Sequence, residues 1–220
     1  MEVWKKLRRA DACNSAWSGG ETAQLLIEPP EADYAARDFL WRVSSATVEL
    51  ERSDFTPLPD YRRYIVTLEG EIRLRHNGGA PICLKPLEVH AFDGADDTRS
   101  EGRCTDFNLM LRKGAAEGSM RTLCVCGAAD LQTEPGAQAL LLYDARGSCT
   151  VTDGVQRESL SPGRVCCWLR MQSYACVWRA RQSCFAVRWE KRAHEARFFA
   201  SAAPYHRKGG RSQRSKNGRI

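Results

Sequence analysis

Two short stretches of the chain place polar side chains at alternating positions, as they would lie on one face of a β-strand. Arg42 and Ser44 alternate with apolar residues in this way, and so do Asp106 and Asn108. If both polar faces point into a barrel together with Arg63, the lining holds two cations, one acid and two neutral polar groups. Guanidinium groups match carboxylates, so this set suits a small carboxylate ligand.

Two structural alternatives remain open at this point. The same alternation would arise if the polar residues faced water. Arg42 would also be explained by a structural ion pair with Asp106.

The elements that must position these residues are short strands. Apolar residues recur at every second position, for example in Tyr64–Leu68, and Gly, Pro, Asn or Asp interrupts the pattern about every ten residues. The segment that begins at Tyr64 also matches the segment that begins at Ala139. In each, a glycine (Gly70, Gly147) precedes a Leu-x-Pro turn at Leu84 and Leu160. Two similar antiparallel barrels are therefore expected.

Five strings point to a known family. They are WSGGET (17–22), FLWRVSSATVE (39–49), FTPLPDYRRY (55–64), LEGE (68–71) and DFNLM (106–110). Together they resemble the HutD/Ves family, with one departure at Glu21, where the family often has Thr. The resemblance implies an all-β bicupin, in which two antiparallel β-sandwich barrels pack in one chain. It also implies a ligand-binding or regulatory role with no established reaction.

We expect residues 1–12 to form an N-terminal extension, 13–118 the first barrel and 119–198 the second barrel. The remainder, 199–220, is expected to be a disordered basic tail, because residues 201–220 hold six Lys or Arg and no acid. Those six charges equal the net charge of +6, which leaves the rest of the chain neutral. The composition of the tail is compatible with two functions, a non-specific arm for nucleic acid or a solubilising segment. We favour the second, and do not expect nucleic acid as a partner.

No metal or other cofactor is expected. Metal-binding cupins use histidines and a glutamate upstream of a glycine, and anchoring that pattern on Gly70 places Arg63 in the glutamate position. The four histidines are His76, His90, His194 and His206, and none lies within two residues of another. His90 is interpreted as a core or rim histidine, although it is kept as a ligand-contact candidate.

The WSGGET string contributes four further ligand-contact candidates, Ser18, Gly19, Gly20 and Thr22. Consecutive glycines permit a close backbone approach, and such a loop can offer N–H groups to an anion. The alternative is a plain turn in a covering hairpin.

The chain has ten cysteines but no CxxC pair. It also lacks a signal-peptide pattern and an apolar run of membrane-spanning length. We therefore expect a cytoplasmic protein with reduced thiols and no membrane partner.

The favoured function is metal-independent binding of a small carboxylate metabolite by a sensor or regulator. The family resemblance points to histidine breakdown, with urocanate or formylglutamate as the ligand. One alternative is a cofactor-free isomerase or hydrolase with Asp106 or His90 as general base. The other is an interaction protein that forms a homodimer through its second barrel and has a vestigial pocket.

Overall fold

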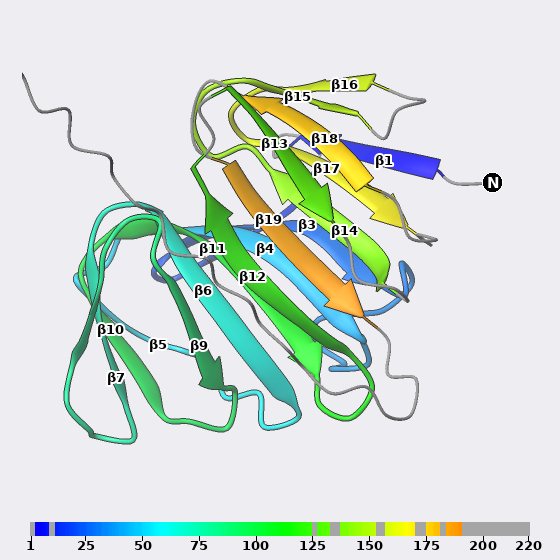
Figure 1. Ribbon diagram of the computed structural model, residues 1–220. Coiled ribbons are helices and arrows are strands. Elements are labelled where there is room, and N and C mark those ends of the chain that lie inside the picture. Colours follow the sequence, from blue (N-terminus) through cyan, green and yellow to red (C-terminus); the bar gives the residue numbers. More distant parts are fainter. Residues whose placement is uncertain are drawn as a thin grey trace, which may run out of the picture.

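The computed structural model describes residues 3–8, 12–124, 127–132, 137–152, 157–169, 175–180 and 184–190. They form four sheets in which every pairing is antiparallel (Figure 1). Within these ranges no helix has the length and apolar character to cross a membrane. The expected basic tail, 199–220, lies outside the described residues.

The first barrel consists of a six-stranded and a four-stranded sheet. The six-stranded sheet has the order β2 (Cys13–Trp17), β3 (Gly20–Glu28), β4 (Trp41–Val48), β11 (Cys104–Arg112), β6 (Tyr61–Glu69) and β9 (Val89–Asp93). The four-stranded sheet has the order β5 (Arg52–Asp54), β10 (Thr98–Glu101), β7 (Ile72–His76) and β8 (Ile82–Leu84). Between the two sheets lies an apolar core of Ile65, Ile72, Leu74, Leu84, Phe92 and Cys104.

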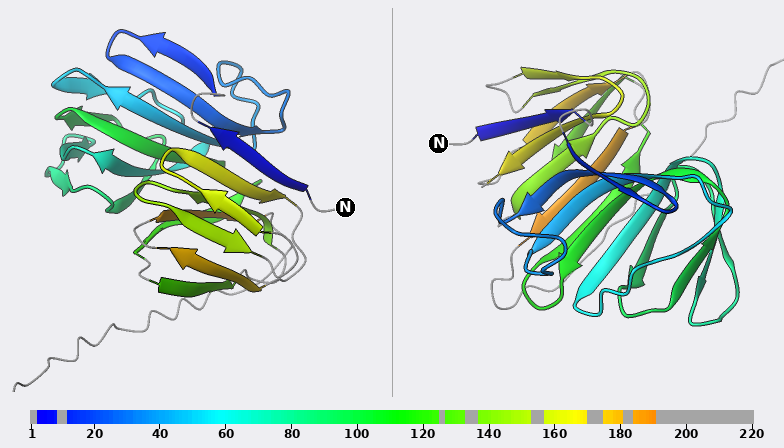
Figure 2. Two further views of the ribbon diagram at one scale, coloured as in Figure 1. Left: turned by 90° about the horizontal axis from the view of Figure 1, so that it is seen from above. Right: turned by 180° about the vertical axis from the view of Figure 1, so that it is seen from behind.

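The second barrel is built in the same way. Its five-stranded sheet has the order β1 (Val3–Arg8), β17 (Arg164–Leu169), β14 (Ala137–Tyr143), β19 (Cys184–Glu190) and β12 (Glu117–Leu123). Its four-stranded sheet has the order β13 (Gly127–Gln132), β18 (Ala175–Ala180), β15 (Cys149–Thr152) and β16 (Arg157–Leu160). Residues 3–8 of the expected N-terminal extension thus form β1 in this barrel (Figure 2), and the expected boundary at residue 118 lies inside β12.

The internal repeat corresponds to a repeated set of strands. In the first barrel β6 pairs with β9 and β7 with β8, and in the second β14 pairs with β17 and β15 with β16. Gly70 and Gly147 both adopt positive φ, 79° and 107°, between the first and second strands of each copy. The expected all-β bicupin fold is confirmed.

The two barrels share one apolar core. The six-stranded sheet contributes Trp41, Val43, Val66, Leu68, Phe107, Leu109 and Leu111, and the five-stranded sheet contributes Met120, Ala139, Leu141 and Tyr143. Because strand side chains alternate, each strand that sends these residues toward the second barrel sends its other residues into the first. That second set carries the polar candidates.

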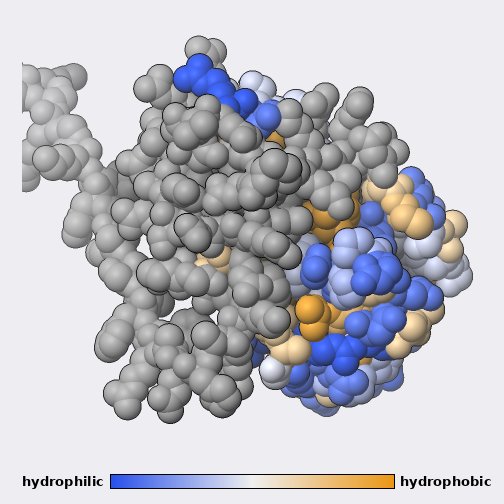
Figure 3. Space-filling model, turned by 90° about the vertical axis from the view of Figure 1, so that its right-hand side faces the viewer, coloured by the Kyte–Doolittle hydropathy of each residue, from blue (hydrophilic) through white to orange (hydrophobic). Residues whose placement is uncertain are grey.

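Large apolar side chains are mostly withdrawn from the surface. Among the described residues, Trp17, Leu50 and Ile82 are the large hydrophobic side chains that are exposed. On the face shown in Figure 3, the coloured surface is mainly hydrophilic with small hydrophobic patches. A further apolar cluster of Phe39, Leu58, Tyr61 and Met110 is buried apart from the two cores given above.

Candidate functional site

Five of the candidate side chains lie on the side of the six-stranded sheet that faces the interior of the first barrel. They are Arg42 and Ser44 on β4, Arg63 on β6, and Asp106 and Asn108 on β11, and all five are buried. We call them the polar cluster. Met110 pairs with Arg42 on one neighbouring strand and with Arg63 on the other, so the two arginines lie at the same level of the sheet.

The guanidinium of Arg42 is held by neutral groups. Its Nε donates a hydrogen bond to Oε1 of Gln24 at 2.7 Å, and its Nη1 donates to Oγ of Ser44 at 3.0 Å. Its central carbon lies 4.3 Å from the ring centroid of Tyr34, a cation–π distance. Burial lowers the pKa of Arg42. The guanidinium does not pair with Asp106, which removes the structural bridge as an explanation for this residue.

Arg63 lies between two aromatic rings. Its central carbon is 5.0 Å from the ring centroids of both Phe55 and Phe92, and its Nη1 donates to the carbonyl oxygen of Thr56 at 3.2 Å. Within the described residues its Nε–H has no hydrogen-bond acceptor. Burial lowers the pKa of Arg63 to about 10, so the side chain is still cationic at neutral pH. A buried cation with an unused donor is a strong point of attraction for an anion.

Asp106 and Asn108 are bonded to each other on β11. Oδ1 of Asp106 accepts the backbone N–H of Ala46 at 3.0 Å and Nδ2 of Asn108 at 2.6 Å. The backbone carbonyl of Asp106 accepts the hydroxyl of Ser45 at 2.7 Å. These bonds fix the direction of both side chains. Oδ1 of Asn108 is left without a donor among the described residues.

Several residues of this region carried no recognised signal in the sequence. Thr67 lies on the same face of β6 as Arg63, and strand alternation would have identified it. Gln24 and Phe92 reach the arginines from β3 and β9. Tyr34 comes from the loop between β3 and β4, and its ring also lies 4.2 Å from the central carbon of Arg37. A loop residue of this kind has no periodicity to reveal it.

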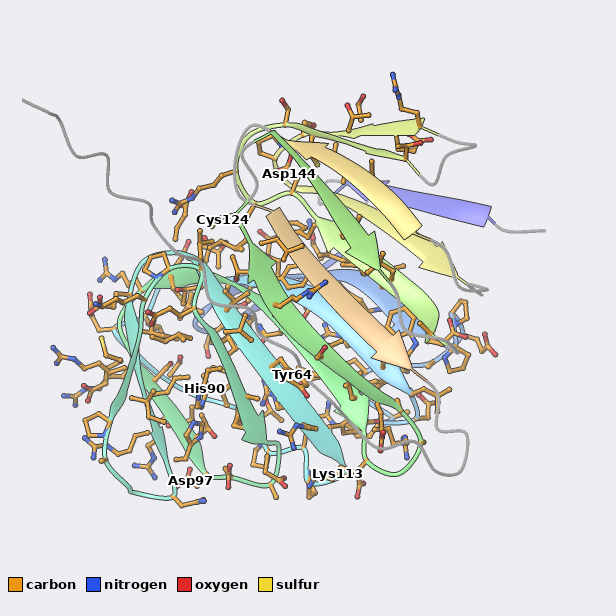
Figure 4. The ribbon with its side chains drawn as sticks, in the orientation of Figure 1. Tyr64, His90, Asp97, Lys113, Cys124 and Asp144 are labelled. Atoms are coloured by element: carbon orange, nitrogen blue, oxygen red, sulfur yellow. The ribbon has the colours of Figure 1, made fainter. Side chains whose placement is uncertain are left out.

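His90 lies on β9 in the first barrel (Figure 4) and is half-buried. Its Nε2 is 2.9 Å from Nε2 of His76, and Nδ1 of His76 is 2.8 Å from Oγ1 of Thr98. Burial, and then the nearby His76, lower the pKa of His90. The spacing of the two histidines in the sequence concealed this contact. In the described parts of the chain, no group of three or more His, Cys, Asp or Glu side chains is arranged to hold a metal ion.

The structure does not bring Ser18, Gly19 and Gly20 to the polar cluster. Gly20 pairs with Val48, six positions along β4 from Arg42, which corresponds to roughly 20 Å of extended strand. Gly20 instead allows the start of β3 to lie close against β4, because a Cβ on Gly20 would lie 1.9 Å from the carbonyl oxygen of Thr47. Thr22 is nearer, opposite Ala46, and is half-exposed.

Fold and cluster together define a bicupin with buried arginines in its first barrel. The chain belongs to the HutD family, whose model matches residues 9–186. It is similar to a conserved protein of unknown function from Pseudomonas aeruginosa PAO1, with 23% identity, a TM-score of 0.74, and coverage of 86% of this chain and 98% of that one. It is also similar to HutD from Pseudomonas fluorescens SBW25, with 21% identity, a TM-score of 0.72, and coverage of 87% and 100%.

A further relative is protein Ves from Escherichia fergusonii. It is 34% identical over 107 residues, which are 46% of this chain and 53% of Ves. The match thus spans about half the length of that protein.

Proposed function

We propose that this protein binds a small carboxylate metabolite at the polar cluster, without a metal ion, and acts as a sensor or regulator. One observation carries the proposal. Arg42 and Arg63 are both buried at one level of the sheet, and their hydrogen-bond partners among the described residues are neutral. Burying a cation is costly unless an anion or strong acceptor compensates it, and a bound carboxylate would supply that compensation.

Binding accounts for these residues better than catalysis does. A general base needs a free basic atom within reach of a substrate proton. Oδ1 of Asp106 already accepts two hydrogen bonds and Nε2 of His90 is bonded to His76, so both side chains are held in fixed orientations. These contacts favour fixed recognition groups over proton carriers.

The proposed ligand class includes intermediates of histidine breakdown. This part of the proposal is supported by family membership and by the name of the P. fluorescens HutD, whose structure was obtained in a formate condition. Formate, urocanate and formylglutamate are therefore the first probes. We further propose a cytoplasmic location, because Cys13, Cys83 and Cys104 are free thiols.

A thermal-shift screen tests the proposal directly. A carboxylate at a hundred times its Kd should stabilise the protein by about 2.7 kcal/mol, and added divalent metal should not change that effect. Methyl esters of the same acids are the matched controls, since they remove the negative charge and keep the carbon skeleton. If acids and esters shift the melting temperature equally, or if none of the probes binds, the proposal is wrong.

A further inference from the structure

Three buried polar atoms on the barrel-facing side of the sheet have no hydrogen-bond partner among the described residues. They are Nε of Arg63, Oγ1 of Thr67 and Oδ1 of Asn108. Their residues are 6%, 0% and 6% exposed, so bulk water does not satisfy them. Buried polar groups are nearly always paired, and a group of unpaired ones indicates a missing partner.

The register places these atoms within reach of one small molecule. Asn108 on β11 pairs with Ile65 on β6, and Ile65 stands between Arg63 and Thr67 on the same face of that strand. Asn108 is therefore a diagonal neighbour of both, at a Cα separation of roughly 7 Å. A molecule of a few bonds' length spans that distance between side chains that all point into the barrel.

The chemistry of each atom restricts what the molecule must offer. Nε–H of Arg63 can only donate a hydrogen bond, so it requires an acceptor. The amide of Asn108 is oriented by its bond to Asp106, because a carboxylate oxygen accepts and must face Nδ2. Oδ1 of Asn108 then points away from Asp106, and it can only accept. The hydroxyl of Thr67 serves either role.

The cluster also has electrical polarity. Arg42 and Arg63 lie at one end of the cluster, at the level of Met110, and the Asp106 carboxylate lies at the other end, four residues away along β11, with Asn108 between the two levels. A second carboxylate at that end would lie beside the Asp106 carboxylate and the Oδ1 acceptor of Asn108, and the hydroxyl of Thr67, opposite Asp106, could donate a single hydrogen bond to it. A ligand with one negative group and one N–H or O–H donor would satisfy both ends.

We propose that the ligand carries a carboxylate and, a few bonds away, an N–H or O–H donor, and that Asn108 selects for this donor. This inference rests on the proposed function, since the carboxylate is assigned to the arginines. It adds a requirement for a hydrogen-bond donor on the ligand, which the arginines cannot impose because they are donors themselves. Simple monocarboxylates such as formate lack the donor, and a dicarboxylate such as formylglutamate would place its second charge beside Asp106. Of the probes given above, urocanate meets the criterion, with one carboxylate and a ring N–H.

The test compares two acids of equal charge and nearly equal shape, pyrrolylpropanoate and furylpropanoate. The pyrrole ring presents an N–H where the furan ring presents an oxygen without hydrogen. Isothermal titration calorimetry on the unaltered full chain should show the pyrrole acid binding about tenfold more tightly or better, because the furan leaves Asn108 unpaired. This comparison needs no variant to fold.

Two variants then localise the effect. In Asn108→Leu the preference for the pyrrole acid should fall to about twofold or less, whereas Arg63→Leu should weaken both acids. Equal affinities in the unaltered protein, with both acids weakened by Arg63→Leu, would overturn the role of Asn108 and leave the proposed function standing. Failure of both acids to bind would overturn both proposals.

Discussion

The imidazoles of His76 and His90 face each other across the first barrel, with their Nε2 atoms 2.9 Å apart and their ring centroids 5.1 Å apart. The hydroxyl of Thr98 donates to the carbonyl oxygen of Asp96, so it accepts from Nδ1–H of His76. Nε2 of neutral His76 is then an acceptor, and Nε2–H of His90 donates to it. Double protonation of the pair would place two N–H groups against each other.

This pair predicts a pH dependence of stability. Because the pKa of His90 is lowered in the folded protein, the unfolded chain binds more protons once the pH falls below about 6.5. The free energy of unfolding should therefore fall between about pH 6.5 and pH 5, where most carboxylates are still ionised. Urea denaturation at a series of pH values measures this slope. His90→Gln should flatten this slope. An unchanged slope in that variant would show that His90 does not cause the pH dependence.

Arg63→Leu should weaken carboxylate binding by ~1.5–3 kcal/mol, the usual contribution of a hydrogen bond to a charged group. The folded state should persist, because the variant removes a buried charge and leaves an apolar side chain between Phe55 and Phe92. Titration calorimetry and a melting curve measure the two effects. Arg62→Leu is the matched control, since Arg62 is the next residue on β6 and its side chain is exposed. Equal losses of carboxylate affinity in both variants would show that the carboxylate does not bind at Arg63.

Metal analysis of protein purified without chelators should find no stoichiometric Fe, Mn, Ni, Zn or Cu. The expectation rests on the sequence pattern, which aligns Arg63 with the glutamate of metal-binding cupins, and on the fact that a guanidinium does not coordinate cations. Treatment with EDTA should leave both the melting temperature and carboxylate binding unchanged. One equivalent of metal located inside the first barrel would contradict this reading of Arg63.

Gly20→Ala should destabilise the fold without changing ligand affinity. Gly20 has φ 149°, and an added Cβ would meet the backbone oxygen of Thr47 at 1.9 Å. Gly78→Ala is a suitable comparison, because Gly78 also has positive φ (70°) but nothing lies within 4 Å of its added Cβ. Thermal or urea unfolding should show Gly20→Ala to be worse by ~1–3 kcal/mol, the typical cost of overpacking. A selective loss of carboxylate binding in Gly20→Ala would contradict this prediction and indicate that the hairpin turn contacts the ligand.

The barrel-facing positions were predictable because strand alternation is exact. A period of two assigns Arg42 and Ser44 to one face once the strand is recognised, and the same holds for Asp106 and Asn108. Contacts between strands from different sheets were not predictable, since no local pattern specifies which segments meet across a barrel. The contact between His76 and His90 belongs to this kind.

The position of the hairpin turn depended on register as well. WSGGET is a clear turn signal, but the distance of that turn from Arg42 follows from how far β3 and β4 pair along each other. Tyr34 illustrates a different limit, because loop residues show no periodic relation to the cations they contact.

The shared core of the two barrels also limits which sequence changes the polar cluster can accept. Phe107 and Leu109 are anchored in the second barrel's packing, and Asp106 and Asn108 alternate with them along β11. An insertion of one residue in this strand would exchange the two sets. Apolar side chains would then point into the first barrel, and Asp106 and Asn108 would point into the apolar core that the two barrels share. Single substitutions on the barrel-facing side of β11 are therefore compatible with the fold, whereas the length of this strand is constrained by its packing against the second barrel.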